Sequence, residues 1–141
     1  MVSRVAVLGA GSWGTTVAAL LAPVVSTVLW ARRTELADDL NAGRGNERYL
    51  PGFDLPPDLE ATADLGEATS DAALVLVAVP TQGFRAVLEG SEATLGAAVP
   101  VVSLAKGFER GSCLRMTEVA SEVLPGRPVA VLTGPNLAKE V

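Results

Sequence analysis

The sequence predicts an α/β protein built on a doubly wound parallel sheet, because uninterrupted apolar runs alternate with stretches of helical spacing. Strands that helices cover on both faces are apolar throughout their length. The expected strands are Arg4–Leu8, Val25–Ala31, Ala73–Val79, Val99–Leu104 and Val129–Thr133. The expected helices are Ser12–Ala22, Thr34–Ala42, Gln82–Leu88 and Cys113–Leu124. The repeated β-α-β order requires right-handed crossovers between neighbouring strands.

Length and composition predict one compact domain over residues 1–141, since 141 residues with 49% apolar content can bury a single core. No apolar run is long enough to cross a bilayer and no signal-peptide pattern opens the chain, so we expect a cytoplasmic protein without a membrane span. Cys113 is the single cysteine and histidine is absent, which argues against a disulfide and a transition-metal site. The net charge of −5, without a basic block, argues against nucleic acid as a partner.

The ends of the second helix and the segment after it carry turn signals. Thr34 can cap this helix and Gly43 can end it. The stretch Asn41–Pro57 is the longest irregular one, with several glycines and prolines. A loop of this length in a compact domain is usually functional or mobile.

A glycine-rich loop follows the first predicted strand directly and opens the first predicted helix. Gly9, Gly11 and Gly14 have the spacing of a dinucleotide-binding fingerprint, in which they serve the tight turn, the close approach of a pyrophosphate and the packing of helix on strand. The helix N-terminus offers free N–H groups to the phosphates. Ser12 either adds a hydroxyl to a phosphate or caps the helix, and Trp13 either covers the cofactor or packs into the core. The loop predicts a Rossmann-like nucleotide site.

The end of the second predicted strand bears on which dinucleotide binds. NAD sites place an acidic residue there for the ribose 2′-hydroxyl, whereas NADP sites place arginine. Arg32 and Arg33 occupy this position and no carboxylate does. We therefore expect NADPH or NADH as cofactor, with NADPH favoured; two solvated arginines at a strand end are the alternative.

Two later strand ends belong to the same edge of the predicted sheet, where ligands of such sheets bind. Thr81 can cap the helix after Pro80, which we favour over a ligand contact for Thr81 and Gln82. Lys106 follows a strand at once and either directs its charge into the crevice or is an ordinary surface lysine.

The stretch after the last predicted strand ends in a second candidate anion site. Gly134 begins a turn, and Asn136 is well placed to cap a helix that starts there. Beside a phosphate, such a helix start can bind an anion.

Taken together, these stretches resemble the NAD(P)-dependent glycerol-3-phosphate dehydrogenases. The matching segments occur in the family's order and cover nearly the whole chain: GAGSWGT at the start, LWARR, NERYLPG at Asn46–Gly52, AVPTQGFRAVL at Ala78–Leu88, SLAKGFE at Ser103–Glu109 and GPNLAKEV at Gly134–Val141. The resemblance implies reduction of dihydroxyacetone phosphate to sn-glycerol 3-phosphate with NAD(P)H, a step that feeds phospholipid synthesis. It also implies a possible homodimer of the full-length form.

The resemblance further implies roles for individual residues. The cofactor contacts it implies are Ser12, Trp13, one of the pair Arg32 and Arg33, Lys106 and Ala138; the substrate contacts are Lys106, Gly134 and Asn136. Asn136 departs from the serine or threonine common at its position. The resemblance places the proton-acceptor lysine in a helical second domain beyond Val141, so we expect no catalytic residue in this chain, little turnover from it alone and a nucleotide domain that is not quite complete.

Two other functions fit the same motifs. One is another two-domain NAD(P)-dependent dehydrogenase, acting on a different hydroxy or keto acid. The other is a dinucleotide-sensing module without catalysis, since a fold does not fix a function. Lys106 and the stretch Gly134–Lys139 favour an enzyme, because a sensor would not need them.

Overall fold

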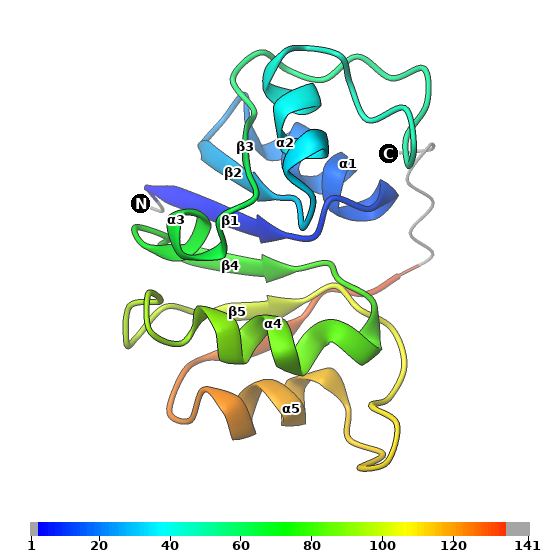
Figure 1. The fold of residues 1–141 in the computed structure, drawn as a ribbon. Coiled ribbons are helices and arrows are strands. Elements are labelled where there is room, and N and C mark those ends of the chain that lie inside the picture. Colours follow the sequence, from blue (N-terminus) through cyan, green and yellow to red (C-terminus); the bar gives the residue numbers. More distant parts are fainter. Residues whose placement is uncertain (1–2, 135–141) are drawn as a thin grey trace.

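A computed structural model describes residues 3–134 of the chain. It shows a six-stranded sheet in the order β3-β2-β1-β4-β5-β6, with every neighbouring pair parallel (Figure 1). The strands are β1 (Arg4–Leu8), β2 (Ser26–Trp30), β3 (Glu60–Thr62), β4 (Leu74–Val77), β5 (Val101–Ser103) and β6 (Val129–Val131). The helices are α1 (Ser12–Leu21), α2 (Thr34–Asn41), α3 (Leu65–Thr69), α4 (Phe84–Ser91) and α5 (Met116–Val123), with a 3-10 turn η1 (Thr81–Gly83) before α4.

The sheet is covered on both faces, which explains the continuous apolar runs. Along β1, Val5 and Val7 point into a core shared with α1 and α2, whereas Ala6 and Leu8 point into a core shared with α3, α4 and α5. In Figure 1, α1 and α2 lie in the upper half of the view, and α4 and α5 lie below. The doubly wound architecture expected from the sequence is confirmed.

The strand order places a topological switch point between β1 and β4. The chain winds from β1 outward to β2 and β3, and then returns to β4 on the other side of β1 and continues to β6. In sheets of this kind ligands bind beyond the carboxyl ends of the strands at such a point. The arrowheads of β1, β4 and β5 all point to the right in Figure 1, so the candidate site lies at that edge.

The structure confirms the five expected strands and adds one strand and one helix. The edge strand β3 and the short helix α3 were missed. Helix α5 begins later than expected, because Cys113 adopts a left-handed conformation (φ 58°) in the turn before it.

The ends of α2 test two expected turn signals. Gly43, with a φ of 71°, lies just after the helix end as expected. Thr34 as cap was wrong, because Arg33 holds the N-cap position and Thr34 is already helical.

Candidate functional site

A pocket of about 700 Å³ opens at the carboxyl ends of the central strands. This volume lies within the range typical of small-molecule sites, about 300–1,000 Å³. Most of its lining comes from four places in the chain: the glycine loop, the end of β2 with the start of α2, the end of β4 with η1 and α4, and the end of β5. Tyr49, from the long loop between α2 and β3, completes the lining.

The three glycines of the loop serve different purposes in the structure. Gly9 has a φ of 117°, and a Cβ there would lie 2.8 Å from the carbonyl oxygen of Ala78 on the neighbouring strand end. A Cβ at Gly14 would overlap the carbonyl oxygen of Gly9. Gly11 has no atom within 4 Å of the place where its Cβ would be. Gly9 and Gly14 therefore permit the fold, whereas Gly11 leaves the pocket side of the loop open.

The N-terminus of α1 faces this pocket. Gly11 is the N-cap, and no side chain caps the helix or places an acidic group in its first turn. The first N–H groups of a helix have no partner within it and carry partial positive charge, which suits an anionic ligand. Ser12 is exposed and lines the pocket, so its reading as the helix cap was wrong.

Trp13 belongs both to the pocket and to the core. Its side chain is partly buried against the cluster beneath α1 and also lines the pocket. Its indole Nε1 is buried and has no hydrogen-bond partner among the described residues. By contrast, Nε1 of Trp30, on the floor of the pocket, donates to the carbonyl of Ala63 at 3.1 Å.

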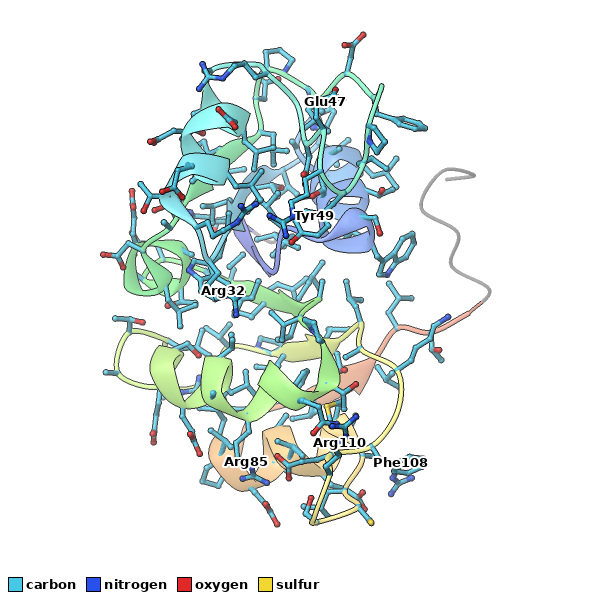
Figure 2. All side chains as sticks on the ribbon, turned by 45° about the vertical axis from the view of Figure 1, so that its right-hand side comes forward. Arg32, Glu47, Tyr49, Arg85, Phe108 and Arg110 are labelled. Atoms are coloured by element: carbon cyan, nitrogen blue, oxygen red, sulfur yellow. The ribbon has the colours of Figure 1, made fainter. Side chains whose placement is uncertain are left out.

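The positive charge at the pocket comes from Arg32 and Arg33, which follow β2 and line the pocket. Both are exposed, and neither forms an ion pair with any residue that the structure describes. Figure 2 shows Arg32 and Tyr49 in the same region of the molecule, well apart from Arg85, Arg110 and Phe108. Tyr49 was not among the site residues expected from the sequence, although it lies in the longest irregular stretch and in the NERYLPG segment.

Lys106 lies at the rim of the site rather than in the pocket lining, which ends at Ala105. Its Nζ donates to the carbonyl of Gly134 at 2.8 Å, so the structure brings together two residues expected to share a substrate. Asn136 and Ala138, the other residues expected there, lie outside the described residues.

The segment that carries Lys106 is fixed by side chains of η1. The hydroxyl of Thr81 donates to the carbonyl of Lys106 at 2.7 Å, and the amide of Gln82 donates to the carbonyl of Phe108 at 3.2 Å. Thr81 as helix cap was wrong, because Pro80 is the N-cap of η1 and no side chain caps it. Gln82 also lines the pocket.

Two arginine–glutamate pairs near this segment shift pKa values. The hydrogen bonds from Arg85, and then the one from Ser112, lower the pKa of Glu109 to about 2. The hydrogen bonds from Arg115 lower the pKa of Glu118 to about 2. Both carboxylates therefore stay charged at neutral pH and keep their ion pairs with Arg85 and Arg115.

Residues 3–134 contain neither a metal-binding cluster nor a membrane-spanning helix. Within that range, no three histidine, cysteine, aspartate or glutamate side chains gather in a way that could hold a metal ion. Within the same range, no helix has the length and apolar character to cross a membrane.

The sequence of this chain matches a known family over nearly its whole length. Residues 4–141 match the family described as NAD-dependent glycerol-3-phosphate dehydrogenase N-terminus. The chain belongs to this family. Among its relatives, a glycerol-3-phosphate dehydrogenase [NAD(P)+] of Sphingopyxis alaskensis is 49% identical over 138 residues, covering 98% of this chain and 41% of the relative. The enzyme of the same name from Thermobifida fusca is 48% identical over 143 residues, covering 99% of this chain and 43% of its own length.

A solved structure of this family shares the fold. The crystal structure of glycerol-3-phosphate dehydrogenase from Coxiella burnetii superposes with a TM-score of 0.90 at 34% identity, covering 98% of this chain and 42% of that one. The chain therefore spans about two fifths of the length of the relatives it matches. The family resemblance expected from the sequence motifs is confirmed.

Proposed function

We propose that this chain supplies the cofactor-binding part of a glycerol-3-phosphate dehydrogenase that interconverts dihydroxyacetone phosphate and sn-glycerol 3-phosphate with NAD(P)H. The observation that carries the proposal is the glycine loop at the switch point, with its open Gly11 facing a pocket that ends in two arginines. Family membership supports the reaction, and the curated relatives carry that enzyme name.

The described residues fit a dinucleotide along the pocket. Gly9, Gly11 and Gly14 let the backbone approach a pyrophosphate, and the free N–H groups of α1 bind it. The Ser12 hydroxyl adds a donor beside these groups, and the Trp13 ring covers the bound cofactor.

At the far end of the pocket, Arg32 and Arg33 bind the 2′-phosphate of NADPH. Because the two guanidinium groups have no acidic partner among the described residues, they are available to a phosphate. The arrangement favours NADPH over NADH.

At the rim, Lys106 holds and polarises the substrate. When bound, the reduced nicotinamide supplies the hydride for the carbonyl carbon of dihydroxyacetone phosphate. The ammonium of Lys106 faces the carbonyl oxygen, where negative charge develops, and the Gly134 carbonyl keeps it in place. The lysine that exchanges the proton lies beyond Val141 in this proposal, as do the groups that bind the substrate phosphate, while Asn136 and Ala138 complete the substrate and cofactor contacts. The complete enzyme is a homodimer in this proposal, acting in glycerophospholipid synthesis.

Cofactor binding is tested by titrating the purified protein with NADPH and NADH while following the fluorescence of Trp13 and Trp30, which both line the pocket. We expect saturable quenching, with the lower Kd for NADPH. No response to either cofactor would overturn the proposed nucleotide site.

Substrate choice is tested in the complete enzyme by following NADPH oxidation. Dihydroxyacetone phosphate is the expected substrate, and 2-keto acids of similar size serve as controls. Turnover of the keto acids alone would favour another dehydrogenase, and cofactor binding without turnover of any of them would favour a sensor.

A further inference from the structure

Asn46 is a fully buried polar residue in the loop that joins α2 to β3, residues 42–59, and its amide reaches the glycine loop. Its Nδ2 donates to the carbonyl of Ala10 at 3.1 Å and to the hydroxyl of Thr15 at 2.7 Å. Ala10 lies between the first two glycines, and Thr15 lies in the first turn of α1. One side chain thus joins the phosphate-facing loop to the helix that follows it.

The chemistry of the groups fixes how the Asn46 amide is turned. The Ala10 carbonyl can only accept a hydrogen bond, so the amide nitrogen must face it. Oδ1 then remains buried and accepts no hydrogen bond from any residue that the structure describes. Burying an unpaired carbonyl oxygen is unfavourable, which an apolar side chain of similar size would avoid. The two hydrogen bonds that the Asn46 amide donates therefore indicate that this side chain does more than fill the core.

The bond to Ala10 determines where the next N–H group points. In a planar trans peptide, the carbonyl of one residue and the N–H of the next point in opposite directions. With the Ala10 carbonyl held by Asn46, the N–H of Gly11 points away from Asn46. Gly11 lines the pocket, and no atom lies within 4 Å of the place where its Cβ would be.

The backbone of Asn46 also holds the turn that carries Tyr49, another residue of the pocket lining. Its carbonyl accepts from the N–H of Tyr49 at 3.1 Å and from the N–H of Leu50 at 2.7 Å. This turn leaves Tyr49 in the pocket lining and buries Leu50. Asn46 therefore connects the glycine loop with the aromatic residue that the 42–59 loop contributes.

We infer that Asn46 is a positioning residue of the nucleotide site, which aims the Gly11 N–H at the ligand's pyrophosphate and ties the 42–59 loop to the glycine loop. The inference rests on the proposed function for the class of ligand. It predicts that losing the Asn46 amide weakens every dinucleotide alike, because NADPH and NADH share the pyrophosphate.

The experiment compares Asn46→Leu with a matched control, Asn41→Leu, in the purified protein. Asn41 also makes two side-chain hydrogen bonds, both to the backbone of Ala61 at 2.8 Å, and it lines neither the pocket nor the glycine loop. For each variant, Kd is measured for NADPH and NADH, together with the Tm without ligand. We expect Asn46→Leu to raise both Kd values about tenfold or more with their ratio unchanged, and Asn41→Leu to lower Tm with Kd within about twofold of wild type.

A second pair of variants keeps the inference testable if Asn46→Leu does not fold. Thr15→Ser retains the hydroxyl that accepts from Asn46, whereas Thr15→Val removes it at nearly the same size. We expect Thr15→Val to weaken both cofactors and Thr15→Ser to retain most of the affinity. Wild-type Kd in Asn46→Leu, or equal losses in the Asn46 and Asn41 variants, would overturn the inference. A wild-type protein that binds neither cofactor would overturn the proposed function, and the inference with it.

Discussion

Arg85 on α4 binds Glu109 through two parallel hydrogen bonds, Nε to Oε1 at 2.8 Å and Nη2 to Oε2 at 3.0 Å. The same Nη2 donates to Glu122 on α5 at 2.8 Å, and the hydroxyl of Ser112 donates to Glu109 at 2.6 Å. Glu109 lies in the segment between β5 and α5, residues 104–115, which also carries Lys106. Arg85 therefore joins two helices to the segment that bears the proposed substrate-binding lysine.

The Arg85–Glu109 pair predicts a loss of stability in acid. Its hydrogen bonds lower the pKa of Glu109 from its ordinary value of 4.5 to about 2. A depressed folded-state pKa contributes stability above the unfolded-state value, and this contribution disappears as the pH falls from about 4.5 to about 2. We expect Glu109→Gln to lower the free energy of unfolding at pH 7, and the difference from wild type to shrink as the pH falls through this window. Urea denaturation at a series of pH values measures both curves.

The control for this prediction is Glu89→Gln, on the exposed face of α4. Glu89 forms no ion pair with a described residue, so its variant should follow the wild-type curve. A difference between wild type and Glu109→Gln that stays constant down to pH 2 would contradict the assignment of the shift to Arg85.

Two glycine-to-alanine substitutions in the glycine loop should affect different properties: one should weaken cofactor binding, and the other should lower the free energy of unfolding. Gly11→Ala adds a methyl group in open space at a φ of −74°, which alanine accepts, so the free energy of unfolding should stay within about 1 kcal/mol of wild type. The methyl group would, however, stand where a pyrophosphate must approach, and Kd for NADPH should rise about tenfold or more. Gly14→Ala forces a Cβ onto the Gly9 carbonyl and should cost about 1–3 kcal/mol of stability.

Chemical denaturation and fluorescence titration together separate the two effects. If Gly11→Ala binds NADPH as wild type does, the pyrophosphate lies elsewhere and the proposed binding mode is wrong. If Gly14→Ala is as stable as wild type, helix and loop are not in the close contact that the structure shows.

The strands could be predicted because burial on both faces leaves a signal within each segment. The bounds expected for the first strand, Arg4 to Leu8, are those of β1, because no polar residue interrupts the apolar run after Arg4. β3 left no such signal: Glu60, Ala61 and Thr62 form a three-residue edge strand, and only its pairing with β2 makes it a strand. The glycine loop could likewise be predicted from its motif, because the tight turn and the close packing of helix on loop require glycine at fixed positions.

The remaining parts of the site depend on contacts between distant residues. Asn46 contacts Ala10, 36 residues away, and nothing in the local sequence indicates that pair. Thr34 and Thr81 were expected to cap helices from residue type alone, but the chain enters each helix one residue earlier, at Arg33 and Pro80. Thr81 is instead bound to the Lys106 carbonyl, 25 residues away.

The arginine pair predicts a change of cofactor preference. In Arg32→Ala or Arg33→Ala, Kd for NADPH should rise about tenfold to a hundredfold, because a charge-assisted hydrogen bond to a phosphate contributes about 1.5–3 kcal/mol. Kd for NADH should change little, since NADH lacks the 2′-phosphate. Arg44→Ala is the matched control, because it removes a nearby arginine that is paired with Asp39 and lies outside the pocket lining. An equal rise in Kd for NADPH and NADH in both variants would show that the two arginines do not bind the 2′-phosphate.

Lys106 predicts a loss of turnover that exceeds any loss of cofactor binding. In the complete enzyme, Lys106→Met removes the ammonium proposed to face the carbonyl oxygen while keeping much of the side chain's length. Removing one such donor lowers kcat by about a hundredfold to a thousandfold in comparable sites. We expect a fall of that order in kcat/KM for dihydroxyacetone phosphate, with a smaller change in Kd for NADPH, because Lys106 lies at the rim and not in the pocket lining.

The matched control for Lys106 is Arg110→Met, which removes another exposed cation from the 104–115 segment. The Arg110 backbone N–H, which this substitution leaves in place, donates to Gln82 at 3.2 Å, so the segment should remain anchored. Steady-state kinetics with varied dihydroxyacetone phosphate, together with NADPH titrations, compare the two variants. Near-wild-type kcat/KM for Arg110→Met beside a large loss for Lys106→Met would assign the effect to the position of one ammonium group. Equal losses in both would mean that the charge of the whole segment attracts the anionic substrate, and Lys106 would then have no distinct role.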